Sequence, residues 1–131
     1  GQMSPMHFHW NKMEDIINRG GGTLVIQMYN SHPETDLLDQ ESPVTIHSDG
    51  RVYTVPAGSK IRLRPGESIT VYQGQYHSFW AEGGKTMVIE VSQCNDDSKD
   101  NRFLEETGRF PEVEEDTPAE FLLCTEYPVV L

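Results

Sequence analysis

The sequence is poor in basic residues, with 10 Lys and Arg against 21 Asp and Glu among 131 residues and a net charge of −11. This excess repels nucleic-acid phosphates and anionic lipid headgroups, which argues against DNA or RNA binding and against docking to an acidic membrane surface. No apolar run approaches the roughly 20 residues that span a bilayer, and no basic-then-apolar leader opens the chain. We therefore expect a cytoplasmic protein with a neutral or cationic small-molecule partner.

Cysteine is also scarce, since the chain has only Cys94 and Cys124. Their wide separation lacks the close spacing of a paired metal-ligand motif. A disulfide and two reduced thiols both stay open, and a cytoplasmic location favours the thiols.

Short segments rich in β-branched and aromatic residues dominate the middle of the chain, which predicts an all-β fold. The predicted strands cover residues 23–29, 44–47, 51–54, 60–63, 68–72, 77–80 and 86–91. The dipeptides Asp49-Gly50 and Gly83-Gly84 suit tight hairpin turns, because both residues tolerate positive φ angles. The expected architecture is an antiparallel sandwich or barrel.

Two segments depart from this strand pattern. Near the start, Asn11 as an N-cap, Met13, Ile16 and Ile17 on one face, and the following glycines predict one short helix. Residues 96–116 hold nine acidic and three basic residues, so more than half of the net charge lies there. We expect this stretch to form an irregular, partly helical excursion that packs against the body of the protein.

A cluster of metal-ligating residue types occurs close to the N-terminus. His7 and His9 share one face of a strand, because they are two residues apart. Glu14 follows five residues later, and one carboxylate oxygen with two imidazole nitrogens suits Mn, Fe, Co, Ni or Zn. Taken alone, Glu14 is equally well explained as the capping-box partner of Asn11.

The wider spacing resembles the two motifs of the cupin superfamily. Gly1-x5-His7-x-His9-x4-Glu14-x6-Gly21 fits the first motif, and Gly66-x5-Tyr72-x-Gly74-x2-His77 fits the second, with Tyr72 where proline is usual. The resemblance implies a jelly-roll β-barrel that holds a metal through His7, His9, Glu14 and His77. It does not by itself imply a reaction.

Longer stretches narrow the resemblance to one family. Residues 7–10, 12–22, 76–80, 90–92, 95–97 and 101–103 are similar to D-lyxose ketol-isomerases. Members of that family are longer, so we expect residues 1–131 to be a single cupin domain, the C-terminal part of a longer chain whose N-terminal strands are absent. The resemblance implies Mn²⁺, with Co²⁺, Zn²⁺ or Fe²⁺ as other divalent candidates. It also implies interconversion of D-lyxose with D-xylulose, and of D-mannose with D-fructose.

Such an isomerisation needs a Lewis acid, a base that moves a proton between C1 and C2, and an acid for the substrate oxygens. If Gly83-Gly84 formed a hairpin turn, Glu90 would stand opposite His77 on the same face. We therefore predict Glu90 as the base. With the family resemblance, Lys12, two residues before Glu14, is predicted as the acid or oxyanion stabiliser, and a solvated lysine is the alternative. For Glu90, an orienting partner of a ligand histidine is the alternative, and a metal-mediated hydride shift also stays open.

Several further residues are expected at the mouth of the barrel. Phe79 shares the face of His77 and offers a flat apolar surface to a sugar ring. From the acidic segment, Asp97, Arg102, Glu105 and Glu106 are candidates for sugar-hydroxyl contacts, with a solvated charge run as the alternative. Outward-facing aromatic residues such as Trp80 favour a homodimer. A non-catalytic sugar-binding cupin and an iron cupin dioxygenase are the alternative functions.

Overall fold

The computed structural model describes residues 1–106, 114, 116–122 and 127–128. In this part of the chain nine strands form one curled sheet, and no helix occurs. The strands are β1 (His7–Phe8), β2 (Glu14–Ser31), β3 (Leu38–Asp39), β4 (Val44–Ser48), β5 (Arg51–Val55), β6 (Lys60–Leu63), β7 (Ser68–Val71), β8 (Gln75–Ser92) and β9 (Arg102–Phe103).

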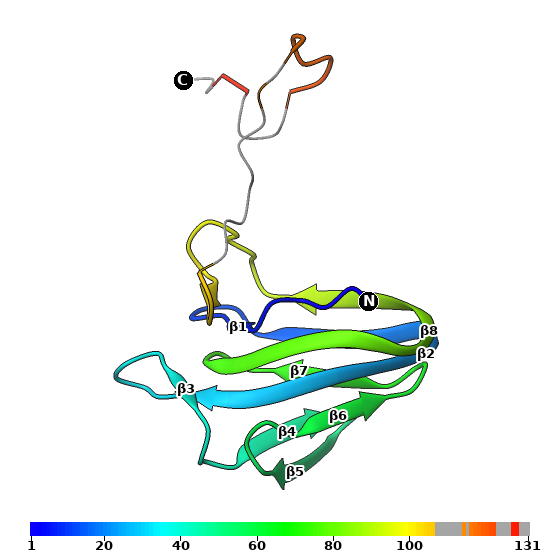
Figure 1. Ribbon diagram of the computed structural model, residues 1–131, viewed down its shortest axis with the longest axis vertical. Coiled ribbons are helices and arrows are strands. Elements are labelled where there is room, and N and C mark those ends of the chain that lie inside the picture. The colour runs from blue at the N-terminus through cyan, green and yellow to red at the C-terminus, as the bar shows by residue number, and fades with distance from the viewer. Residues whose placement is uncertain (107–113, 115, 123–126, 129–131) are drawn as a thin grey trace.

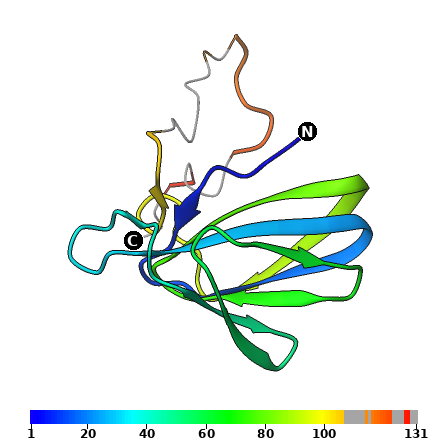
Figure 2. The same cartoon turned by 60° about the horizontal axis from the view of Figure 1, so that its bottom comes forward.

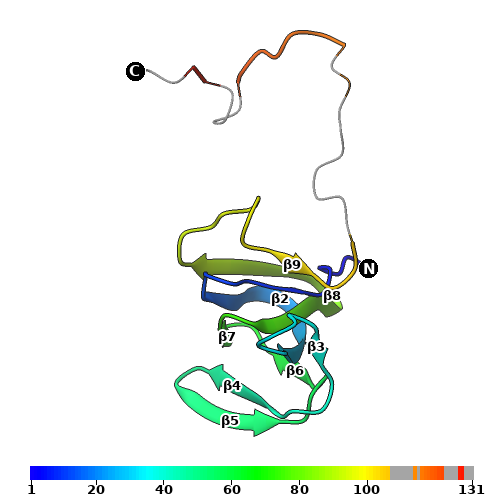
Figure 3. The ribbon, with the colours of Figure 1, turned by 90° about the vertical axis from the view of Figure 1, so that its left-hand side faces the viewer.

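The strand order is β5-β4-β7-β2-β8-β1-β9, with β3 and β6 also paired to β2. Figure 3 shows the β4–β5 hairpin at one side of the sheet and β9 at the other. The described residues include no helix long and apolar enough to cross a membrane.

The two long strands β2 and β8, of 18 residues each, pair antiparallel along almost their whole length and bend back together. Figures 1 and 2 show both ribbons turning at the same end of the molecule. Gly20, Gly21, Gly83 and Gly84 have positive φ angles at these bends. At Gly21 the φ is +95°, and an added Cβ would collide with the backbone carbonyl of Lys85. Glycine at this position therefore allows the backbones of the two paired strands to approach closely.

The bends place the two halves of each long strand in facing layers. The first half of β2 pairs with β7 and with the end of β8, whereas its second half pairs with β6 and the start of β8. Burial of each large aliphatic side chain between the layers contributes about 1.5–3 kcal/mol. The core consists of Ile16, Leu24, Ile26, Met28, Val44, Ile46, Leu63, Ile69 and Val71. The result is an all-β, barrel-like body.

The strand predictions are confirmed, because all seven predicted segments fall within β2, β4, β5, β6, β7 and β8, apart from one terminal residue. The turn at Asp49-Gly50 is also present, with φ angles of 48° and 74° between paired strands β4 and β5. Cys94 is a free, exposed thiol, and Cys124 lies outside the described residues.

The predicted N-terminal helix is wrong, because residues 14–31 form strand β2. Burial alternates from Glu14 to Asn18, which is the strand period of two, so Ile16 enters the core while Ile17 faces outward. Two adjacent β-branched isoleucines favour a strand over a helix. The expected helical character of residues 96–116 is likewise absent from the described part of that segment, where turns and β9 occur instead.

The predicted hairpin at Gly83-Gly84 is also wrong. These glycines lie inside the single strand β8, so residues 77 and 90 are not paired with each other. His77 pairs with Met28, and Glu90 pairs with Ile16. Two consecutive glycines with positive φ here bend a strand around the core and do not reverse the chain into a two-residue turn.

Candidate active site

Three histidines converge at the end of the sheet where β1 meets β8. His7 on β1 is the cross-strand partner of His77 on β8, and His9 follows β1 directly. The ring centroids lie 4.3 Å apart for His7 and His77, and 5.6 Å apart for His9 and His77. One ring nitrogen from each histidine lies within 4.8 Å of the others. This spacing would allow all three to bind one metal ion.

Each histidine is held in the same tautomer by a backbone carbonyl. The Nδ1 atoms of His7, His9 and His77 lie 2.8, 2.8 and 3.0 Å from the carbonyl oxygens of Pro5, Asp100 and Gln75, respectively. A carbonyl oxygen only accepts, so Nδ1 carries the hydrogen in the neutral ring and Nε2 keeps a lone pair. Metal-binding histidines are commonly oriented in this way.

Glu14 supplies an oxygen ligand next to these lone pairs. Its carboxylate is 2% exposed at the start of β2, with Oε1 2.9 Å from His77 Nε2 and Oε2 3.5 Å from His9 Nε2. Burial alone raises the pKa of the Glu14 carboxyl, but contacts with His77, His9 and Lys12 outweigh it and hold the pKa far below its ordinary value. The carboxylate is therefore ionised.

The donor set fits a first-row divalent metal ion. Within the described residues, the Nε2 atoms of His9 and His77 are buried without a hydrogen-bond partner. Burial, followed by proximity to His77, lowers the pKa of His7 to about 3, so its imidazole is neutral and available near neutral pH. Three imidazole nitrogens and one carboxylate oxygen suit Mn, Fe, Co or Zn.

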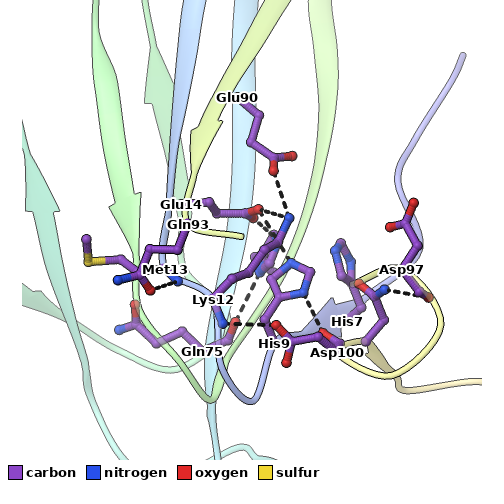
Figure 4. Close-up of polar contacts among 12 residues, drawn as sticks. His7, His9, Lys12, Met13, Glu14, Gln75, Glu90, Gln93, Asp97 and Asp100 are labelled. Carbon is purple, nitrogen blue, oxygen red and sulfur yellow. Dashed lines mark hydrogen bonds and ion pairs between the residues drawn. The ribbon is translucent and has the colours of Figure 1, made fainter. Parts of the chain in front are cut away.

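Lys12 connects this centre to a second carboxylate, as Figure 4 shows. Its Nζ lies 2.9 Å from Glu14 Oε2 and donates a hydrogen bond of 2.7 Å to Glu90 Oε1. Burial lowers the pKa of the Lys12 ammonium, but the hydrogen bonds to Glu90 and Glu14 outweigh it and raise the pKa above its usual value. Lys12 is thus a buried cation, 5% exposed, between two anions.

Glu90 reaches the site through pairing with β2, and not through the predicted pairing with His77. Glu90 pairs with Ile16, which lies on the same face of β2 as Glu14, two residues away. Glu90 is thus the diagonal cross-strand neighbour of Glu14, and this position on β8 brings it to the site. Unlike Glu14, the Glu90 side chain is 47% exposed and is accessible from the pocket.

A cavity of about 530 Å³ opens above the histidines. Of the residues predicted to contact substrate, Phe79 and Asp97 line it. Arg102, Glu105 and Glu106 are not among its lining residues, and Arg102 Nη1 instead donates a hydrogen bond of 2.6 Å to the Phe103 carbonyl. The lining is formed by Ser4, Pro5, His7, His9, Lys12, Glu14, Phe79, Glu90, Asn95, Asp97, Asn101 and Phe103.

Sequence reasoning missed some of these pocket residues, and also Asp100 behind the pocket wall. The Phe103 ring stacks on His7 with centroids 5.4 Å apart. Phe103 and Asn101 belong to a stretch that carries the family resemblance, which could have identified them. Asp100 is one acidic residue among nine in its segment, and no spacing rule distinguishes it.

Solved structures share the fold of this chain. The ligand-free L-ribose isomerase of Cellulomonas parahominis superposes with a TM-score of 0.53 at 22% identity, over 79% of this chain and 53% of that protein. The structure of the same enzyme with L-ribose gives a TM-score of 0.50, also at 22% identity, over 79% of this chain and 54% of that one. Similarity at this level of identity shows a common fold.

Sequence relatives are much closer. D-lyxose/D-mannose isomerase of Serratia proteamaculans is 52% identical over 128 residues, which are 96% of this chain and 55% of that protein. The enzyme of the same name from Escherichia coli O157:H7 is 49% identical over 128 residues, 96% of this chain and 56% of that protein. The chain thus spans about half the length of these relatives. Residues 1–127 match the sequence pattern of the D-lyxose isomerase family, so the chain belongs to that family.

Proposed function

We propose that this chain carries the catalytic centre of a metal-dependent aldose–ketose isomerase that interconverts D-lyxose with D-xylulose and D-mannose with D-fructose. The observation that carries the proposal is the contact between a buried lysine and a pocket-exposed carboxylate, Lys12 and Glu90, directly beside three histidine lone pairs. The names of the relatives at about half identity support the choice of sugars.

His7, His9, Glu14 and His77 would hold the metal ion, which we assign as Mn²⁺. Co²⁺, Zn²⁺ and Fe²⁺ accept the same donor set. When bound, the ion supplies a Lewis acid that polarises the sugar carbonyl. The open cavity and its polar lining, including Asn95, suit a neutral polyhydroxylated substrate.

The proton chemistry is assigned to Glu90 and Lys12. Conversion of an aldose to its 2-ketose moves one hydrogen from C2 to C1 and one from O2 to O1. The Glu90 carboxylate takes the C2 proton, which leaves an enediolate, and the Lys12 ammonium donates a proton to O1. Glu90 then returns its proton to C1 while the O2 proton passes to the neutral Lys12 amine, so both residues regain their starting protonation. The Lys12 ammonium, 2.7 Å from Glu90 Oε1, stabilises the negative charge that develops on the substrate oxygen.

The Lys12–Glu90 pair also favours an isomerase over a non-catalytic sugar-binding protein. Desolvating a lysine is costly unless it is paired, and a protein that only binds sugar needs no acid–base pair at its metal centre. The iron dioxygenase alternative needs a dry pocket, whereas this cavity is open and bordered by Glu90 and Asp97.

The proposal includes a cupin-type jelly-roll barrel and a cytoplasmic homodimer. The curled sheet supports the former. Outward-facing apolar side chains support the dimer, because Val52, Met87 and Val91 are 63%, 63% and 59% exposed. Burial of such residues against a second copy would remove apolar surface from water.

The test is a ketose assay on the purified protein with D-lyxose, before and after chelation. We expect D-xylulose to form, activity to cease with chelator, and Mn²⁺ to restore it. Assays with other pentoses and with hexoses, D-mannose included, define the substrate range. No ketose from any pentose or hexose after Mn²⁺ addition would overturn the proposed function.

A further inference from the structure

Asp100 is a buried carboxylate that none of the roles assigned above uses. Residues 91–99 are all exposed, and Asp100 at the end of this run is only 2% exposed. Burying a carboxylate is costly unless hydrogen bonds replace its water. Its burial within an otherwise solvated segment therefore indicates specific contacts.

These contacts all reach the turn between β1 and β2. Asp100 Oδ1 accepts hydrogen bonds from the backbone N–H and the side-chain Nδ2 of Asn11, at 2.8 and 2.9 Å. Asp100 Oδ2 accepts the backbone N–H of Lys12 at 2.9 Å, and the Asp100 carbonyl accepts His9 Nδ1–H at 2.8 Å. Asp100 thus contacts three residues of the four-residue stretch 9–12, namely His9, Asn11 and Lys12.

The same residue also belongs to the segment that forms one wall of the cavity. Asn95, Asp97, Asn101 and Phe103 all line the cavity and lie on either side of Asp100 in sequence. The ends of this segment are attached by backbone hydrogen bonds, from Gln93 N–H to the Met13 carbonyl at 3.0 Å and from Leu104 N–H to the Met6 carbonyl at 2.9 Å. Between these ends, the Asp100 carboxylate ties the wall to the backbone of Lys12.

We infer that Asp100 is a positioning residue of the isomerase. Its carboxylate fixes the Lys12 backbone, so that the ammonium stays between Glu14 and Glu90, and it holds the cavity wall at its place over the histidines. This inference rests on the proposed function, because Lys12 has a catalytic role only there. Hydrogen bonds to an ionised acceptor are short and strong, which suits them to this task.

The first test is Asp100→Asn with Asp96→Asn as its matched control. The asparagine keeps one acceptor oxygen for Asn11 but places an N–H donor against the Lys12 N–H. We expect kcat to fall about 10–100-fold, the range typical of lost orienting contacts. Because no substrate or metal contact is removed, KM should stay within about twofold, with Mn²⁺ still bound. Asp96 lies in the same segment, is exposed and hydrogen-bonds Ser98, so Asp96→Asn should leave kcat unchanged.

The second test is amide hydrogen exchange in the Mn²⁺-loaded protein without sugar. Asp100→Asn should lose protection at the Lys12 amide, and Asp100→Ala should lose it at both Asn11 and Lys12. Asp100→Ala also frees the cavity wall, so it should raise KM as well as lower kcat. Asp96→Asn should match the wild type in all of these measurements.

Three results would be decisive against these ideas. If the wild type is active and Asp100→Asn matches Asp96→Asn in kcat and in Lys12 protection, the positioning role is wrong while the isomerase function stands. If the loss of turnover in Asp100→Asn equals the fraction of unfolded protein calculated from its urea titration, Asp100 is merely structural and the inference is wrong. If the wild type forms no ketose, the proposed function itself fails.

Discussion

Replacement of Glu90 by glutamine is the sharpest test of the proposed chemistry. The change keeps the shape of the side chain and removes only its ability to accept a proton from carbon. A positioned general base contributes about 10²–10⁴ in rate, so kcat for D-lyxose should fall by that factor. KM should change little, because an amide oxygen can still accept a hydrogen bond from Lys12.

The structure also sets the expected effect on stability and metal content. Glu90 is 47% exposed, and a partly exposed ion pair contributes about 0–1 kcal/mol. Lys12 keeps its second partner, Glu14, at 2.9 Å. The free energy of unfolding should therefore fall by less than about 1 kcal/mol. Bound Mn²⁺ should stay near the wild-type level, because Glu90 is not one of the four proposed ligands.

Glu82→Gln on the same strand is the matched control. Glu82 is 44% exposed and lies 3.5 Å from Arg62 Nε, and it does not line the cavity. It loses the same charge in a similar environment, so the control variant should keep wild-type turnover. Steady-state kinetics and metal analysis of both variants decide the matter. Near-normal turnover in Glu90→Gln, or loss of metal together with activity, would refute the assignment of Glu90 as the base.

The remaining predictions concern stability and metal binding. Gly50→Ala, at φ +74° with open space around it, should lower the free energy of unfolding by about 1–2 kcal/mol. Gly21→Ala adds a collision with the Lys85 backbone and should lower it by about 3 kcal/mol or more. Urea titrations measure both, and equal losses would contradict the close approach of β2 and β8 at Gly21. Mn²⁺ at about 100 times its Kd should raise the free energy of unfolding by about 2.7 kcal/mol, an increase that His77→Ala abolishes. In the metal-free protein, His7 takes up a proton in the unfolded state below pH 6.5 but in the folded state only near pH 3, so stability falls as pH drops between these values. Urea titrations should show a loss of about 2 kcal/mol from about pH 7 to about pH 5, and a flat profile would contradict the burial of His7.

Much of the site could be predicted because its residues are close in sequence or occupy spaced motifs. His7 and His9 are two residues apart, and one ring nitrogen of each lies within 4.8 Å of the other although β1 ends at Phe8. The sequence predicts a short helix that starts near Asn11 and includes Glu14, whereas in the structure Glu14 begins strand β2, with its carboxylate beside His9 and His77. Short-range spacing thus predicts which side chains gather at this point without fixing the backbone that carries them.

The rest depends on pairings between distant segments, which local patterns do not determine. Gly83-Gly84 satisfies the rule for a hairpin turn, but β8 gains more hydrogen bonds and apolar contact by following β2 around the core. Glu90 therefore reaches the cavity through its register with Ile16, and the predicted pairing with His77 is wrong. Asp100 could not be recognised, because its burial comes from contacts 88–91 residues away.

The hydrogen bonds of the site make protons and metal ions competitors for the same lone pairs. His77 Nε2 and Glu14 Oε1 lie 2.9 Å apart, and with His77 Nδ1–H bonded to Gln75 both atoms are acceptors. Such a contact is stable only with a cation between or beside the two atoms, either a proton or a metal ion. Burial disfavours charging several adjacent imidazoles at once, and burial together with His77 lowers the pKa of His7. A divalent ion satisfies all the lone pairs together, so Mn²⁺ affinity should weaken as the pH is lowered and protons compete for the donors.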